Sequence, residues 1–137
     1  MKVHTLVRAL VGALLFGLGV AAGQLAQTAT DSPQRVEQKR TDLTGAPGME
    51  VVASVAEYKP GDFLGLHSHH GVEVAYVLQG ASVQLQGKGP MALPTGATLL
   101  NLRDVKHAGL KIVGDTSLKL FTVHIVDKGK PLYDYAQ

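Results

Sequence analysis

The stretch from Gly61 to Gly80 constrains the fold of this chain more than any other part of it. It reads GDFLGLHSHHGVEVAYVLQG and holds three potential metal ligands, His67, His69 and Glu73. Glycine and β-branched residues are frequent here, and this composition favours extended backbone over helix. Side chains two positions apart share one face of a strand but diverge on a helix. The spacing therefore predicts a strand on which both imidazoles point the same way.

A turn after the two histidines would bring the carboxylate beside them. Gly71 permits such a turn, and Glu73 lies at the start of the next apolar run. Imidazole and carboxylate groups together bind divalent transition metals, and ligand type alone does not choose among them. A single histidine is more often a surface or core residue than a ligand. It is the glutamate in register with the pair that favours a metal site.

The spacing G-x5-H-x-H-x3-E-x6-G resembles the first conserved motif of the cupin superfamily, and it matches at every fixed position. The second cupin motif, G-x5-P-x-G-x2-H-x3-N, has a partial counterpart that begins at Gly96 and retains His107. Leu102, Asp104 and Lys111 stand where the family has Pro, Gly and Asn. Aspartate tolerates left-handed backbone, so we expect the turn before His107 to form.

This resemblance implies a small, single-domain, exported bacterial cupin of the cupin 2 type, with a jelly-roll barrel over residues 42–132. It implies that His107 joins His67, His69 and Glu73 around one divalent transition metal, which could be Fe, Mn, Ni, Cu, Co or Zn. It also implies a homodimer. Dioxygenase, decarboxylase and isomerase activities all occur in the family.

Short β-type runs separated by Gly or Pro fill the chain from Met49 onward. No helical period interrupts them, and a pattern of this kind is typical of an all-β sandwich or barrel. The H-x-H unit occurs once, which favours one domain. The predicted strands span 49–58, 63–69, 72–78, 81–86, 91–93, 98–102, 107–113 and 118–126.

The N-terminal 22 residues have the features of a secretory signal. Lys2 and Arg8 precede an uncharged run, and small residues lie before a cleavage position near Ala22–Gly23. The run is shorter than the roughly twenty residues needed to cross a bilayer, so we expect cleavage, which would leave a periplasmic or secreted protein. An uncleaved inner-membrane anchor facing the periplasm is the alternative, and only then would the membrane be a partner. Residues 23–41 are polar and predict a linker, with a short helical piece over 35–40.

Composition excludes several classes of protein. Cysteine is absent, which rules out disulfides, thiolate zinc sites and a cysteine nucleophile. The net charge of +2 comes from Lys2 and Arg8 in the leader, so the remaining chain is neutral. With no basic stripe and no set of stacking aromatic residues, nucleic acid is not an expected partner.

Strand parity assigns further residues to the surroundings of the site. Phe63, Ala75 and Val77 fall on the ligand side of their strands and predict an apolar pocket wall. His124 is the one candidate for a catalytic acid or base, and parity leaves it equally able to lie on the outer face of the sheet. Residues 133–137 are expected to form a C-terminal tail.

Three functions are compatible with these features. The first is a metal-dependent enzyme, such as a dioxygenase, decarboxylase or isomerase, acting on a small oxygen-rich organic molecule. The second is a non-catalytic domain that binds or senses a metal or small ligand. The third is a metal-free interaction subunit of a membrane-associated assembly. The fold alone does not select among them.

Overall fold

The computed structural model describes residues 32–136. These residues form eleven β-strands and no helix, which confirms the all-β prediction. The strands are β1 Arg35–Asp42, β2 Met49–Tyr58, β3 Phe63–Leu64, β4 His67–Ser68, β5 Gly71–Gln79, β6 Ala81–Leu85, β7 Pro90–Leu93, β8 Thr98–Asn101, β9 Leu110–Val113, β10 Leu118–Asp127 and β11 Asp134–Tyr135.

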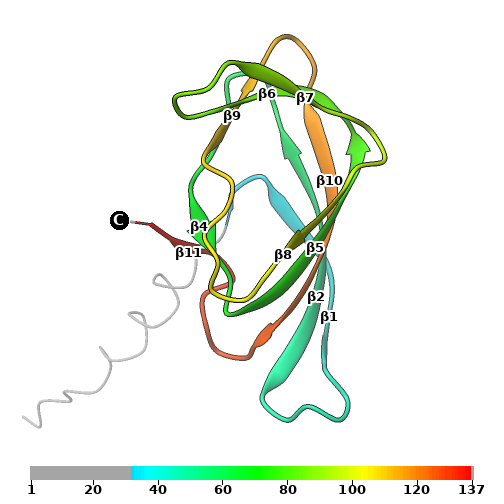
Figure 1. The fold of residues 1–137 in the computed structure, drawn as a ribbon. Helices are drawn as coiled ribbons and strands as arrows, with labels where there is room; N and C mark the ends of the chain where they lie inside the picture. Colours follow the sequence, from blue (N-terminus) through cyan, green and yellow to red (C-terminus); the bar gives the residue numbers. More distant parts are fainter. Residues whose placement is uncertain (1–31, 137) are drawn as a thin grey trace, which may run out of the picture.

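Two antiparallel sheets face each other across a shared core (Figure 1). The larger sheet has the order β1-β2-β10-β5-β8, the smaller has the order β3-β9-β6-β7, and β11 pairs with β4. Both sheets contribute to one buried cluster, Tyr58 and Leu120 from the larger and Val83 and Ile112 from the smaller. The fold is therefore a two-layer jelly roll, as the cupin resemblance implies.

Strict alternation of burial explains why the three central strands form where they do. Along β2, β5 and β10, buried side chains alternate with more exposed ones. Because successive side chains of a strand point to opposite faces, every second side chain lies in the core. The same alternation carries Glu73 on β5 and His124 on β10 to the inner face, because they share parity with the buried residues of their strands.

The outer face of the larger sheet is unusually apolar. Val74 and Tyr76 on β5 face outward, Leu100 is opposite Val74 on β8, and Phe121 is opposite Tyr76 on β10. The solvent face of an antiparallel sheet is normally polar, so a patch of this kind is typical of a covered surface. The homodimer implied by the cupin resemblance stays a prediction.

The linker prediction over residues 23–41 is wrong for its second half. Arg35–Asp42 form the edge strand β1, which pairs antiparallel with β2, and the expected helical piece at 35–40 is part of this strand. Its polar side chains suit an edge strand that is mostly exposed. The ion pair of Arg40 with Glu50 joins β1 to β2, and Arg40 also pairs with Glu37 within β1. No apolar alternation marks such a strand in the sequence.

The prediction of a tail over residues 133–137 also needs correction. Asp134 and Tyr135 form β11, which pairs with Ser68 and His67 of β4. Tyr133 is only 3% exposed and belongs to a second buried cluster with Val52, Val126 and Leu132. The C-terminal segment is therefore an integral part of the domain beyond the predicted boundary at residue 132.

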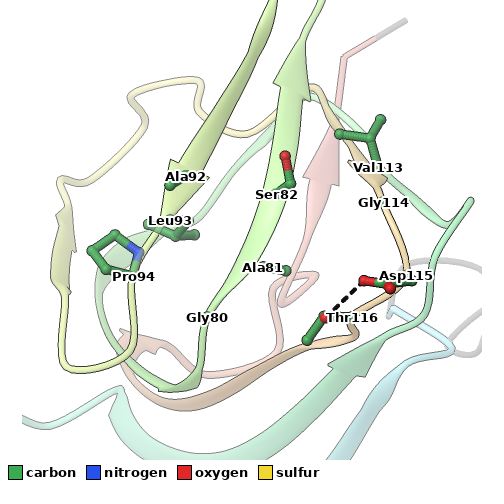
Figure 2. Close-up of a pocket in the computed structure, with 10 residues that line it drawn as sticks. All are labelled: Gly80, Ala81, Ser82, Ala92, Leu93, Pro94, Val113, Gly114, Asp115 and Thr116. Carbon is green, nitrogen blue, oxygen red and sulfur yellow. Dashed lines mark hydrogen bonds between the residues drawn. The ribbon is translucent and has the colours of Figure 1, made fainter.

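A cavity of about 280 Å³ lies beyond the end of β5 that is remote from Glu73 (Figure 2). Ser82, Asp115 and Thr116 supply polar groups there, and the Thr116 hydroxyl donates to the Asp115 carboxylate at 3.2 Å. No candidate site residue lines this cavity.

The described part of the chain includes no apolar helix of membrane-spanning length. The predicted leader and its cleavage near Ala22–Gly23 lie outside the described residues.

Candidate metal centre

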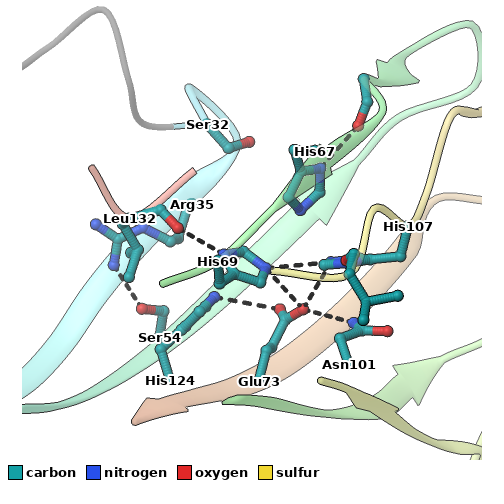
Figure 3. Close-up of polar contacts among 12 residues, drawn as sticks. Ser32, Arg35, Ser54, His67, His69, Glu73, Asn101, His107, His124 and Leu132 are labelled. Carbon is teal, nitrogen blue, oxygen red and sulfur yellow. Dashed lines mark hydrogen bonds and ion pairs between the residues drawn. The ribbon is translucent and has the colours of Figure 1, made fainter. Parts of the chain in front are cut away.

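The four predicted ligands, His67, His69, Glu73 and His107, lie together on the inner side of the fold (Figure 3). One nitrogen or carboxylate oxygen from each is within 4.8 Å of those from all the others. His67 and His69 are at most 1% exposed and Glu73 is 6% exposed. The four side chains predicted from the sequence therefore lie close together in the structure.

The backbone around His107 explains how a partial motif reaches the site. His67 and His107 form a β-bridge with hydrogen bonds of 3.1 and 2.8 Å between their backbones. The Asp104 N–H donates to the His69 carbonyl at 2.9 Å, and Asp104 has a φ of 58°. Aspartate thus adopts the left-handed turn expected at the position where the cupin motif has glycine. Ala108 follows His107 with a φ of 66°.

Each of the three imidazoles is anchored through its Nδ1 atom to a backbone carbonyl. His67 Nδ1 lies 2.7 Å from the Gly65 oxygen, His69 Nδ1 lies 2.5 Å from the Leu132 oxygen, and His107 Nδ1 lies 3.0 Å from the Val105 oxygen. A carbonyl oxygen can only accept, so each Nδ1 carries the proton. In the neutral ring, each Nε2 is then an unprotonated acceptor.

These acceptors face one another and the glutamate. His69 Nε2 is 3.1 Å from His107 Nε2 and 3.1 Å from Glu73 Oε2, and His107 Nε2 is 3.4 Å from the same oxygen. Lone pairs directed at lone pairs repel unless a cation lies between them. Ligands on opposite sides of an ion with bonds of about 2.1 Å would be about 4.2 Å apart, close to the spread observed. The residues therefore fit a metal ion.

The cluster holds Glu73 as a buried anion. Burial acts to raise the pKa of Glu73, but the surrounding imidazoles of His107, His69 and His124 outweigh it and keep the pKa far below its usual value. A buried charge is costly without a compensating one. A divalent cation would supply that compensation directly.

Burial has opposite outcomes for the histidines. It lowers the pKa of His67 to about 4, and that of His124 to about 4. Burial also acts to lower the pKa of His107, but the hydrogen bonds with Glu73 and the Val105 carbonyl and the negative charge of Glu73 together outweigh it, so the pKa of His107 is raised. Without a metal, a proton on His107 therefore takes part of the place of the cation beside Glu73.

We expect the metal-free chain to lose stability as the pH falls from 7 to 5. His67 and His124 have lowered pKa values, so their contribution is complete above 6.5 and is lost as the pH falls toward about 4. Each costs roughly 2 kcal/mol of unfolding free energy at pH 5. His107, with its raised pKa, acts in the opposite direction and offsets part of this loss. Urea unfolding of chelator-treated protein at both pH values measures the difference.

The control for this prediction is the His124→Gln variant, in which the pH dependence should shrink because one buried imidazole is gone. Equal unfolding free energies at pH 7 and pH 5 for the unmodified chain would contradict it.

Sequence reasoning missed three contributors to the site. Asn101 Nδ2 donates to Glu73 Oε2 at 2.7 Å, and the Leu132 carbonyl anchors His69. The Tyr133 ring packs against His67 and His69 with centroid distances of 4.7 and 5.1 Å. Asn101 lies three residues before Asp104 in the partial second motif. Its position on β8 is a sequence signal that could have identified it as a neighbour of the site. Nothing in the local sequence marks the C-terminal contacts.

The predicted pocket wall is partly wrong. Phe63 is 59% exposed, and the break at Gly65–Leu66 between β3 and β4 interrupts the strand parity on which the prediction relied. Ala75 and Val77 do face inward, and Val77 is part of the main core cluster. His124 is 0% exposed, so it lies inside the fold and not on the outer face of the sheet.

No family model matches this chain, and no curated protein does. Among solved structures, it is similar to an uncharacterised conserved protein with a double-stranded β-helix domain from Klebsiella pneumoniae, with 14% identity, 78% of this chain and 88% of that chain covered, and a TM-score of 0.56. It is similar to a structure of the DMSP lyases RdDddP and RnDddQII, with 21% identity, 64% and 44% covered, and a TM-score of 0.50. A cupin 2 conserved barrel domain protein from Leptotrichia buccalis shares 18% identity, with 69% and 42% covered and a TM-score of 0.46.

The chain thus spans less than half the length of the DMSP lyase chains that it matches. These likenesses, all below 25% identity, concern the fold.

Proposed function

On the premise that the chain has the double-stranded β-helix fold of the cupins, we propose that it is an exported protein that binds one divalent transition-metal ion. His67, His69, Glu73 and His107 are the ligands, and the ion binds and polarises an oxygen atom of a small organic molecule. The function is that of a metal-dependent enzyme.

One observation carries this proposal. Three imidazoles are each fixed by a carbonyl at Nδ1, so that three Nε2 lone pairs and one carboxylate oxygen converge on one point. Histidines that serve only as core residues have no need to direct their acceptors at each other. Anchoring of the distal ring nitrogen is the arrangement that orients histidine ligands for a metal.

The donor set leaves room for chemistry. His67, His69, Glu73 and His107 would supply four ligands, so an ion that accepts six would keep two positions for water or for an oxygen of a small molecule. When bound, the ion acts as a Lewis acid toward such an oxygen. The side chain of His107 is 16% exposed whereas those of His69 and Glu73 are 0% and 7% exposed, so solvent reaches the cluster from the side of His107.

A second candidate, a non-catalytic metal-binding or sensing domain, is favoured by the enclosure of the cluster. The Tyr133 ring packs against His67 and His69, and both histidines are buried. Water proton relaxation of the Mn²⁺-loaded protein separates the candidates. Enhanced relaxation that decreases on addition of small carboxylates or diols supports an open, substrate-binding ion, whereas no enhancement supports an enclosed one.

Metal binding itself is tested on the purified chain by elemental analysis and by thermal unfolding. We expect about one transition-metal ion per chain, and we expect removal of the ion by a chelator to lower the stability. At a free metal concentration of 100 times Kd, re-addition should restore about 2.7 kcal/mol, because the ion binds only the folded state. A chain that neither contains a metal nor gains stability from any of the six candidate ions would overturn the proposal.

A further inference from the structure

We propose that His124 and Asn101 clamp the Glu73 carboxylate from opposite sides, so that Glu73 presents only its Oε2 atom to the ion. In this arrangement His124 is a positioning residue and not a ligand. The inference rests on the proposed function and adds to it the residues that set how the glutamate binds.

The sheet register places the three side chains in one row. Glu73 lies on β5, between β10 and β8. His124 of β10 is directly opposite Glu73 on one side, and Asn101 of β8 is directly opposite on the other. Side chains in directly opposite cross-strand positions are close enough to interact. The two partners of Glu73 are thus built into the pairing of the strands.

Each partner addresses a different carboxylate oxygen. Asn101 Nδ2 donates to Oε2 at 2.7 Å, and His124 Nε2 lies 3.4 Å from Oε1 (Figure 3). Oε2 also faces Nε2 of His69 and of His107, whereas Oε1 faces away from them toward His124. The carboxylate is therefore oriented with one oxygen toward the ligand cluster and the other toward the barrel interior.

His124 has a physical reason to keep this contact. Its side chain is 0% exposed, and within residues 32–136 neither ring nitrogen makes an aligned hydrogen bond. A buried N–H without an acceptor is costly, so nearly all such groups in proteins have one. Glu73 Oε1 is the acceptor within reach of Nε2. A hydrogen bond from Nε2–H to Oε1 would give the buried N–H an acceptor and the carboxylate oxygen a donor. It would also occupy the oxygen that could otherwise bind the ion.

The consequence concerns the positions left open on the ion. A glutamate that binds through both oxygens takes two coordination positions, and one that binds through a single oxygen takes one. By holding Oε1, His124 would keep one further position free for an external ligand.

The test compares His124→Leu, which removes the donor, with His124→Gln, which retains an N–H at a similar reach. Thr122→Val is the matched control. Thr122 is 2% exposed on the same face of β10, and its hydroxyl has no hydrogen-bond partner within the described residues. Its cross-strand neighbour on β5 is Ala75 and not Glu73. Co²⁺ affinity is measured by competition titration, the number of nitrogen ligands by X-ray absorption, and the number of bound waters by water proton relaxation of the Mn²⁺-loaded protein. Circular dichroism checks that each variant folds.

We expect His124→Leu to bind Co²⁺ about 10- to 100-fold more weakly and, when loaded with Mn²⁺, to hold one bound water fewer because the freed Oε1 takes its position, whereas His124→Gln and Thr122→Val remain close to the unmodified chain. Asn101→Leu should weaken binding over the same range. An unchanged affinity or an unchanged number of bound waters in His124→Leu would overturn the inference, and so would loss of one nitrogen ligand, which would make His124 a ligand itself. Failure of the unmodified chain to bind Co²⁺ or any other candidate ion would instead overturn the proposed function.

Discussion

Replacing His107 with alanine is expected to lower the affinity for a divalent transition metal by at least about 100-fold, more than a change outside the ligand set costs. The variant loses one metal–nitrogen bond. It also loses the imidazole that lies 3.4 Å from Glu73 Oε2 and helps to hold the carboxylate ionised. The measurement is metal content after dialysis, followed by competition titration with a chelator of known affinity. Because the motif around His107 is degraded, this residue is the most informative ligand to remove.

His70→Ala is the matched control for this experiment. His70 is adjacent to His69 in the chain, but it interacts with Asp104 at 3.2 Å and Asp134 at 3.7 Å and is not part of the ligand group. It should retain the affinity of the unmodified chain. If His107→Ala bound metal as tightly as His70→Ala, His107 would not be a ligand.

The largest loss of stability is expected from Gly71→Ala. A Cβ atom at this position would lie 2.0 Å from the Ile125 carbonyl oxygen and 2.6 Å from the Val126 Cα, both backbone atoms of β10. Backbone of a central strand cannot move aside as a side chain can, so β5 and β10 must separate locally. We expect a loss of more than about 3 kcal/mol in unfolding free energy. Because Gly71 lies between His69 and Glu73, metal binding should fall as well.

Gly89→Ala provides the comparison, since a Cβ there meets no atom within 4 Å and Gly89 is not in the left-handed region. Its unfolding free energy should stay within about 0.5 kcal/mol of the unmodified chain. Urea unfolding followed by circular dichroism measures both variants. A Gly71→Ala protein as stable as Gly89→Ala would mean that β5 and β10 are not packed as described.

Much of the fold could be predicted because the central strands obey the period of two. The predicted run 49–58 coincides with β2, and 118–126 differs from β10 by one residue. Because one face of such a strand is buried, apolar residues recur at about every second position of its sequence. The closeness of His67 and His69 was predictable for a related reason, since residues at i and i+2 on a strand share a face.

The parts that could not be predicted depend on backbone pairing or on distant segments. β1 can be polar because an edge strand is held by backbone hydrogen bonds and ion pairs. Its composition therefore resembles that of a linker. Phe63 was misplaced because parity does not survive the break at Gly65–Leu66. Tyr133 and the Leu132 carbonyl reach the site only through tertiary packing, 63 residues beyond His69 in the case of Leu132.

The contribution of Leu132 and Tyr133 has a consequence for when the ion enters. His67, His69 and Glu73 leave the ribosome well before the segment that anchors His69 and covers the histidine rings. Until that segment is synthesised and docks against β4, His69 lacks its backbone anchor and the rings of His67 and His69 lack their contact with Tyr133. On the proposed function, a metal ion would therefore be bound only after the chain is synthesised, and for an exported chain it would come from the compartment in which the polypeptide finally folds.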